Sequence, residues 1–170
     1  MVDYSTLSIV LTGIGLIVAV TYYTFTIRNQ NRTRQAQLLM GLYDKYSSIE
    51  FLKQNREIAQ QEWTDYEDFK KKYGIENNPD AWGSWQSILS YYNGIGVLLR
   101  KKLIDITLVD ELLANSVFRD WGRMGEILVE WRKEIIAQNP RKRTHGPFDG
   151  FDYLYNELEK YLEEHPELII

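Results

Sequence analysis

The most pronounced feature of the chain is an uninterrupted apolar run near its N-terminus. Residues 6–27 read TLSIVLTGIGLIVAVTYYTFTI and contain neither a charged side chain nor Pro. At a rise of 1.5 Å per residue, a helix of about 21 residues spans the roughly 30 Å hydrocarbon core of a bilayer. The pattern therefore predicts one transmembrane helix, with residues 1–28 forming a membrane anchor.

A cleaved signal peptide and a buried core helix can give a similar apolar run. A signal peptide begins with basic residues before a shorter apolar stretch, but the only charged side chain ahead of this run is Asp3. Aromatic residues stand at both ends, as is typical of membrane–water interfaces: Tyr4 at one end, and Tyr22, Tyr23 and Phe25 at the other. Both features favour the transmembrane anchor.

One face of the predicted span carries small and hydroxyl side chains. They recur at alternating spacings of three and four residues, which places them on one side of a helix: Ser5, Ser8, Thr12, Gly15, Ala19, Tyr22 and Thr26. Small residues let a second helix approach closely within a bilayer, and Gly15 and Ala19 form a small-xxx-small pair. We therefore expect Ser8, Thr12, Gly15 and Ala19 to form a helix-packing interface with an integral membrane partner or with a second copy of the chain. The alternative is a lone anchor that tolerates these residues.

The charges that flank the span predict its orientation. Arg28, Arg32 and Arg34 follow it closely, whereas the short N-terminal side carries one acidic residue. By the positive-inside rule, the part of the chain after the span lies in the cytoplasm. We expect a single-pass protein of the cell membrane with a cytoplasmic C-terminal domain.

Beyond the span, apolar positions recur every three or four residues, and no stretch alternates with period two for long. This pattern predicts an all-α fold, in which residues 29–170 form a soluble multi-helix domain without a sheet. The predicted helices cover residues 29–46, 47–61, about 64–74, about 80–102, a further one from about 108, then 117–138 and 148–164.

Several helix boundaries have recognisable capping residues. Ser47 and Thr64 each precede a Glu by three residues, as in a capping box. Gly74 is placed to end the short third helix of this domain in a left-handed turn. Pro79 suits the first position of the helix that follows.

Two glycines lie inside the predicted helix 80–102, namely Gly94 and Gly96. Inside a helix each costs about 1 kcal/mol relative to Ala, unless another backbone packs against it. Both glycines therefore predict a close helix crossing.

Three segments resemble a widespread group of uncharacterised prokaryotic proteins, in which one N-terminal span precedes a helical domain of unknown function. These segments are YYNGIGVLLRKKLID at 91–105, GEILVEWRKEI at 125–135 and FDGFDYLYNEL at 148–158. The resemblance implies the architecture and the location, and it brings no activity and no catalytic residue. The chain departs from the expected pattern at Lys102, where a Gly would close the preceding helix.

Composition and charge exclude some classes of function. Hydrophobic residues make up 44% and aromatic residues 14% of the 170-residue chain, enough for residues 29–170 to bury a core. The net charge of −4 and the pI near 5.3 argue against a nucleic-acid partner, because phosphate binding needs a surplus of Lys and Arg. The chain contains no Cys, which excludes disulfides and thiolate chemistry.

No group of residues has the spacing of a metal or catalytic site. The two His, His145 and His165, have no ligand partner three or four residues away on a helix. The acidic clusters, which are those at 110–111, 157–159 and 163–164, look like solvent-facing helix positions. No nucleotide-binding loop is present, because the run at 94–96 lacks the third Gly and the preceding strand. We therefore assign no catalytic, cofactor-binding or metal-binding residue.

A short basic segment, Arg141, Lys142 and Arg143, lies between the last two predicted helices. Near an anionic membrane surface each charge contributes about 1 kcal/mol, so these residues are candidates for contact with lipid headgroups. The alternative is a solvated loop, because dedicated lipid patches usually carry more charges.

These observations predict a non-enzymatic interaction or accessory subunit of a larger membrane complex, such as a respiratory, transport or oxygenase complex. The span would pack against a partner helix, and the helical domain would dock on the same assembly. The alternative is a membrane-tethered sensor or regulator that binds a small molecule or a protein through the helical domain. The candidate lining of its binding site is aromatic, namely Trp82, Trp85, Trp121 and Trp131, although such stripes usually form core. A membrane-tethered hydrolase is the least favoured reading.

Overall fold

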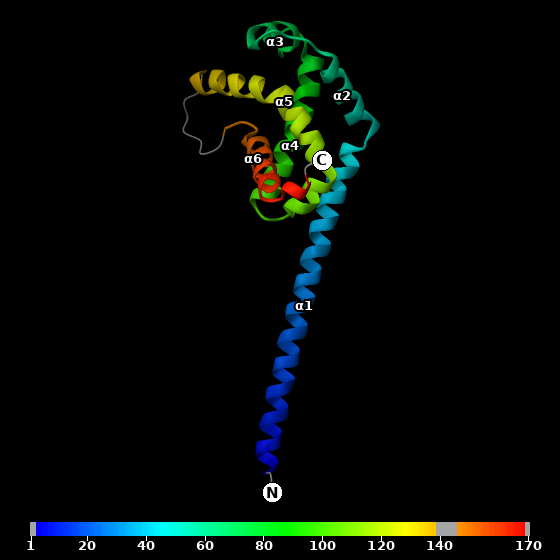
Figure 1. Cartoon of the computed structure of the whole chain (residues 1–170), viewed down its shortest axis with the longest axis vertical. Coiled ribbons are helices and arrows are strands. Elements are labelled where there is room, and N and C mark those ends of the chain that lie inside the picture. The colour runs from blue at the N-terminus through cyan, green and yellow to red at the C-terminus, as the bar shows by residue number, and fades with distance from the viewer. Residues whose placement is uncertain (1–2, 139–145, 169–170) are drawn as a thin grey trace. The chain divides into compact units, whose positions relative to one another are not determined.

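A computed structural model describes residues 3–138 and 146–168. All regular secondary structure in these residues is helical, which confirms the predicted all-α class (Figure 1). Contacts divide the chain into two units, Met1–Leu38 and Leu39–Ile170. The division falls inside α1, the helix Tyr4–Tyr46.

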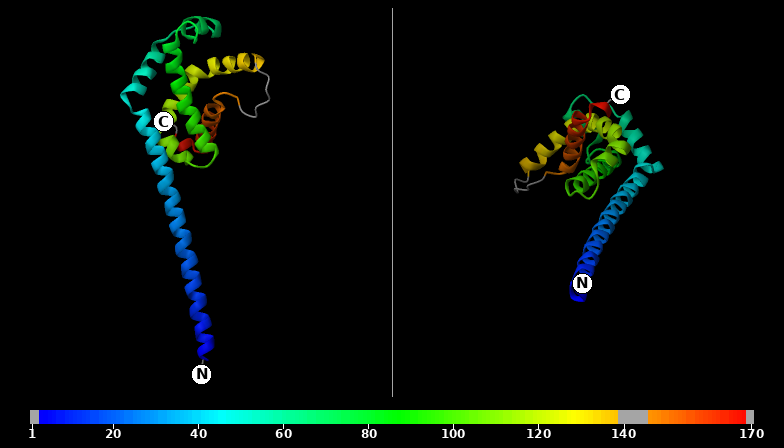
Figure 2. Two further views of the ribbon diagram at one scale, coloured as in Figure 1. Left: turned by 180° about the vertical axis from the view of Figure 1, so that it is seen from behind. Right: turned by 60° about the horizontal axis from the view of Figure 1, so that its bottom comes forward.

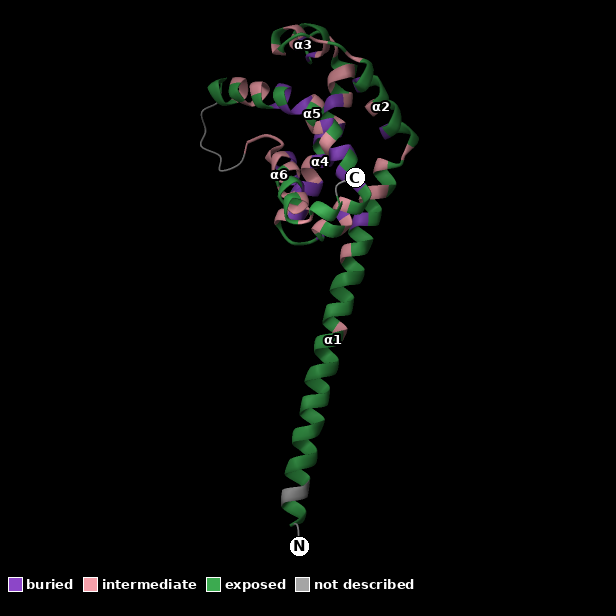
Figure 3. Ribbon diagram, in the orientation of Figure 1, coloured by how far each residue is buried: buried purple, intermediate pink, exposed green. Residues whose placement is uncertain are grey.

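The first unit consists of the N-terminal part of α1. Among the described residues, α1 is the one helix long and apolar enough to be a membrane-span candidate. Its apolar side chains are exposed, as Ile9 at 72% and Ile17 at 67% illustrate, and none of its most apolar window is buried (Figure 3). The predicted long N-terminal apolar helix is therefore present, and its most apolar window is exposed.

The second unit contains the end of α1, five further α-helices and a short 3-10 helix. Their bounds are α2 Ile49–Gln60, α3 Tyr66–Tyr73, α4 Pro79–Arg100, α5 Ile106–Gln138, α6 Asp149–Glu164 and η1 Pro166–Leu168. α4 is the central helix, because it packs on α2, α3 and α6 (Figures 1 and 2). It also supplies eight buried residues, including Trp85, Tyr92 and Ile95.

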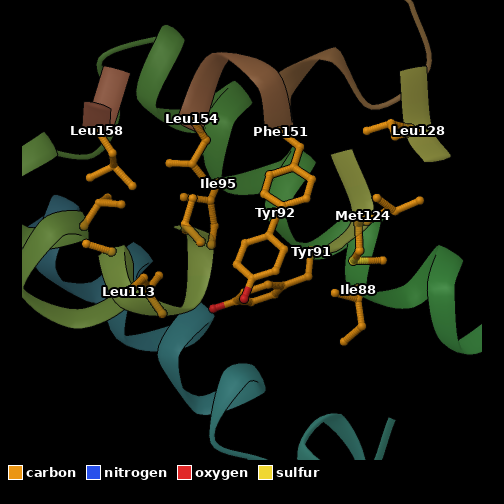
Figure 4. Packing of buried hydrophobic residues seen from close by; sticks show 14 of the residues in the cluster. Ile88, Tyr91, Tyr92, Ile95, Leu113, Met124, Leu128, Phe151, Leu154 and Leu158 are labelled. Atoms are coloured by element: carbon orange, nitrogen blue, oxygen red, sulfur yellow. The ribbon is translucent and has the colours of Figure 1, made fainter. Parts of the chain in front are cut away.

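The core of this unit is aromatic and aliphatic, and α4 and α6 form its centre. The Tyr92 ring stacks on the Phe151 ring with centroids 4.7 Å apart (Figure 4). Trp121 meets Phe151 edge-on at 5.0 Å. Leu113 and Met124 reach the same core from α5. Burying each such side chain contributes about 1.5–3 kcal/mol, so this cluster accounts for much of the stability of the unit.

The N-terminal caps agree with the predicted boundaries to within one residue. Ser48, rather than Ser47, caps α2 and accepts from the Phe51 backbone N–H at 3.2 Å. Asp65, rather than Thr64, caps α3 and accepts from the Asp68 N–H at 2.8 Å. The α4 start is as predicted, with the Asn78 side chain as cap and Pro at the first position.

Two helix C-termini differ from the expectations. Gly74 follows α3 at φ −67°, so the predicted left-handed turn is wrong. The left-handed residue is Lys102, at φ 56°. The N–H of Lys102 donates to the Leu99 carbonyl at 2.8 Å, and that of Leu103 donates to the Leu98 carbonyl at 2.9 Å. This pair of bonds is the Schellman arrangement, and here it is built without glycine.

Of the two glycines inside α4, one makes the predicted helix crossing. A Cβ on Gly96 would stand 1.7 Å from the carbonyl oxygen of Gly150 in α6, whereas one on Gly94 meets nothing within 4 Å. The crossing is further held by Asn93, whose Oδ1 accepts from the Gly150 N–H at 2.9 Å. The prediction is confirmed for Gly96 and is wrong for Gly94.

The region 106–138 is one helix, α5, where the pattern predicted two. The sequence 106–121 contains neither Gly nor Pro, and Leu113, Ala114 and Val117 form one continuous buried face. Asp105 caps its start by accepting from the Thr107 N–H at 2.9 Å. Figure 1 shows that α5 bends along its length. Its second half still supplies buried residues, among them Met124 and Leu128.

Arg132, on that second half of α5, holds the chain where it enters α6. Its guanidinium donates to the carbonyls of Pro147 at 2.6 Å and Phe148 at 2.9 Å, and it pairs with Asp152. Phe148 is left-handed at φ 56° and offers no side-chain cap. Arg132 therefore satisfies backbone oxygens at this turn. α6 itself begins within one residue of its predicted start.

Candidate functional site

The predicted helix-packing stripe lies on the exposed surface of the first unit. Ser8, Thr12, Gly15 and Ala19 are all exposed, and a Cβ on Gly15 would meet nothing within 4 Å. The Thr12 hydroxyl donates to the Ser8 carbonyl at 2.8 Å within the same helix. The proton of the Thr12 hydroxyl is therefore already used within the helix, and Thr12 offers a neighbouring helix a small side chain rather than a free donor.

Of the two basic groups predicted to lie near the membrane, the structure describes the one that follows the span. Arg28, Arg32 and Arg34 are exposed on α1. The lipid-contact candidates Arg141, Lys142 and Arg143 lie outside the described residues, as does His145.

The four candidate Trp do not form one site. Trp85 is fully buried, and its indole N–H donates to Gln61 Oε1 at 2.7 Å. Trp121 stacks on Tyr155 with centroids 5.2 Å apart. Both residues therefore belong to the core and its edge, as aromatic stripes usually do.

Trp82 and Trp131 are brought together, although 49 positions separate them in the sequence. Their rings meet edge to face, with centroids 5.4 Å apart and planes at 61°. They line a cavity of about 350 Å³ between α3, the α3–α4 loop, the start of α4 and the end of α5. Apolar side chains complete its wall, among them Phe69, Ile75 and Ile135. The size is within the range of small-molecule pockets, about 300–1,000 Å³.

A polar cluster at this cavity ties α3 to α5. Glu134 on α5 accepts from Lys70 Nζ at 2.5 Å and from the Tyr66 hydroxyl at 2.6 Å. The hydrogen bond from Lys70, followed by that from Tyr66, holds the pKa of Glu134 below its usual range. Burial, together with the Glu134 carboxylate, raises the pKa of the Tyr66 phenol. Tyr66 therefore remains a neutral donor, and Glu134 remains a charged acceptor.

A second polar group, at Asp120, was not predicted from the sequence. Asp120 on α5 is 4% exposed and accepts from the Tyr92 hydroxyl at 2.6 Å and from Asn55 Nδ2 at 3.1 Å. Arg119 donates to its other oxygen at 2.8 Å. Both oxygens are thus satisfied. A signal was available in the sequence, because Asp120 interrupts the apolar face formed by Val117 and Met124.

Asp120 lies on the wall of an open cleft of about 910 Å³ between α2 and α5. The nearby Arg123 donates to the Ile58 carbonyl at 2.8 Å and lies over the Trp63 ring at 4.6 Å. Its charge stands at the C-terminal end of α2, where a cation is stabilising. These groups are occupied in holding α2 on α5, and we assign this cleft no ligand chemistry.

No metal centre is formed in the part of the chain that the structure describes. Within residues 3–138 and 146–168, no group of three or more His, Asp and Glu side chains converges. The acidic clusters at 110–111, 157–159 and 163–164 therefore do not come together as a site.

One of the three comparisons with known proteins identifies a family for the chain. No curated protein and no solved structure matches the chain. Residues 9–161 match the family model described as a domain of unknown function, DUF4760, and this match extends from the apolar helix almost to the end of α6. Since the match covers most of the chain, the protein belongs to the family defined by this domain of unknown function, DUF4760.

Proposed function

We propose that this protein is a membrane-anchored, non-enzymatic interaction subunit of a larger membrane assembly. The observation that carries the proposal is the apolar surface of α1, whose most apolar window is exposed among the described residues. Moving a side chain such as that of Ile9 or Ile17 out of water contributes about 1.5–3 kcal/mol, so an aqueous helix of this composition would be costly. A bilayer removes this cost along the whole of residues 6–27.

The partner contact in the bilayer is assigned to Ser8, Thr12, Gly15 and Ala19. Between helices in lipid there is no hydrophobic driving force, so association depends on close van der Waals packing at small residues. The surfaces around this stripe carry the large side chains, for example Ile14 and Ile17. A partner helix therefore approaches most closely along the stripe.

The helical domain is assigned to the cytoplasm. Residues 4–43 contain no Asp and no Glu, and their three charges are Arg28, Arg32 and Arg34. Such a one-sided basic flank supports retention of this end on the cytoplasmic side. The domain then adds a second contact to an assembly that the span has already joined, which raises its effective concentration there.

Affinity purification of the full-length chain from mild detergent tests the proposal. The double variant Gly15→Leu, Ala19→Leu should still insert, because the span only becomes more apolar. It should lose the membrane proteins, or the second tagged copy, that accompany the unchanged chain. The matched control is Ile14→Leu, Ile17→Leu, which alters the other surfaces and should retain them. Equal recovery of the same companions with both variants would reject the stripe as an interface.

A second candidate function is favoured by one specific observation, the cavity between Trp82 and Trp131. In this reading the protein is a membrane-tethered sensor or regulator, and the cavity binds its ligand. The two functions are compatible, because the cavity lies within the helical domain and leaves the surface of the span free.

A further inference from the structure

Aromatic side chains form part of the wall of the cavity between α3, α4 and α5, namely Tyr66, Phe69, Trp82 and Trp131. Trp82 and Trp131 meet edge to face with centroids 5.4 Å apart, and both rings line the cavity. Phe148 stacks on Trp131 at 5.7 Å, so the pair is held in place from outside the cavity. The face of an indole ring carries a negative quadrupole and attracts cations.

The charged groups around the same cavity also favour a cationic ligand. Three carboxylates and two ammonium groups line it, and the Lys70 and Glu134 groups neutralise each other at 2.5 Å. This leaves Glu67 and Glu76 against Lys71, so the remaining charge is negative. All three of these side chains are exposed on the rim, where they can adjust to a ligand.

We propose that this cavity binds a small organic ammonium compound with an apolar body. The ring faces and the surplus carboxylate attract the cation, while Phe69, Ile75 and Ile135 receive the apolar part. An anion of equal size is repelled by the carboxylates, and a neutral compound gains only the apolar contact. This inference extends the second candidate function and is independent of the helix-packing stripe, because its residues all lie in the second unit.

Calorimetric titration of the full-length protein in a maltoside detergent provides the test, with benzyltrimethylammonium as the probe. Its neutral carbon isostere, neopentylbenzene, has the same shape without the charge, and benzoate carries the opposite charge. We expect the cation to bind about tenfold more tightly than either, which corresponds to the usual strength of a partly desolvated cation–π contact. Equal affinity for the neutral isostere, or no binding of the cation, would overturn the assignment.

A further titration distinguishes the two possible sources of such a cation, a lipid headgroup and a free ammonium compound. Phosphocholine carries the same quaternary ammonium joined to a phosphate, as in a lipid headgroup. Binding of phosphocholine as tight as that of the probe would assign the cavity to a headgroup. Weaker binding, expected because the carboxylates repel the phosphate, assigns it to a free ammonium compound.

Two variants locate the binding within the cavity. Trp82→Leu removes one ring and should abolish measurable binding of the cation. Since Trp82 also packs on Phe69 and Trp131, a second variant that leaves the core intact is needed. The double variant Glu67→Gln, Glu76→Gln changes only exposed rim positions and should weaken binding several-fold, whereas Glu57→Gln on α2 should not. If Glu67→Gln, Glu76→Gln and Glu57→Gln all bind like the unchanged protein, the proposed charge recognition is wrong.

Discussion

Tyr92 and Asp120 form a hydrogen bond of 2.6 Å in the interior of the helical domain, joining α4 to α5. Neither residue reaches solvent to any extent, with exposures of 0% and 4%. Burial and the neighbouring carboxylate raise the pKa of the Tyr92 phenol, so it stays a donor at every physiological pH. Asn55 on α2 joins the same carboxylate, and three helices therefore meet at one buried charge.

Replacement of Tyr92 by Phe is expected to lower the free energy of unfolding by about 1.5–3 kcal/mol, the usual range for a hydrogen bond to a charged group. The ring still fills its place against Phe151, so the loss reports the hydroxyl alone. Urea denaturation measures the effect. Tyr155→Phe is the control, because its hydroxyl meets Glu159 at the surface, and it should cost little. Equal small effects of the two substitutions would contradict the role given to Asp120.

The two glycines of α4 should respond in opposite directions to the same substitution. Gly96→Ala brings a methyl group against the Gly150 carbonyl and is expected to destabilise the domain by about 3 kcal/mol. Gly94→Ala finds open space and should stabilise it by about 1 kcal/mol through helix propensity. Thermal unfolding of the two variants side by side is the measurement. A stabilising Gly96→Ala would show that α4 and α6 do not cross as described.

Lys102→Gly is expected to raise the free energy of unfolding by about 0.5 kcal/mol. A left-handed non-glycine residue costs about 1–2 kcal/mol, and part of this gain is offset by the greater freedom of Gly in the unfolded chain. The adjacent Lys101 has φ −83°, so Lys101→Gly should instead be destabilising. A loss of stability with Lys102→Gly would mean that the Lys102 side chain has a stabilising role that outweighs its backbone strain.

The Glu134 cluster predicts a particular dependence of stability on pH. Its contacts keep the folded-state pKa of Glu134 below the ordinary value of 4.5, so the folded form binds fewer protons than the unfolded form just below that pH. The stabilisation is therefore present above pH 4.5 and is lost as the pH falls through the lowered folded-state value. Glu134→Gln should reduce the melting temperature at pH 7, and its difference from the unchanged protein should shrink below pH 4.5. A difference that is constant with pH would exclude a charged Glu134 as the cause.

The orientation of the domain can be checked in intact cells. Protease added from outside should leave the C-terminal domain uncut, because Arg28, Arg32 and Arg34 favour its cytoplasmic location. Permeabilised cells provide the control in which the domain is digested. Digestion in intact cells would reverse the assigned orientation.

The helical class and most helix positions were predictable because they depend on local pattern. The apolar run at 6–27 and the caps near Ser48, Asp65 and Asn78 involve residues only a few positions apart. The predictions that failed concerned the exact cap residues and the continuity of α5, which local sequence pattern does not determine. Adjacent polar residues such as Ser47 and Ser48 are equal candidates for a cap, and a helix as long as α5 contains positions that also suit a start.

By itself, the sequence determined the apolar helix, the all-helical class and the absence of Cys chemistry, because composition and spacing express these directly. Only the tertiary structure decided which glycine makes the crossing, which Trp line a cavity and where a buried carboxylate finds its donors. Gly94 and Gly96 are alike along the chain, and only the approach of Gly150, 54 positions away, distinguishes them. Likewise, Trp82 and Trp131 become neighbours only because α4 and α5 pack together in the folded domain. Contacts between distant segments depend on how whole helices pack, and no short stretch of sequence carries that information.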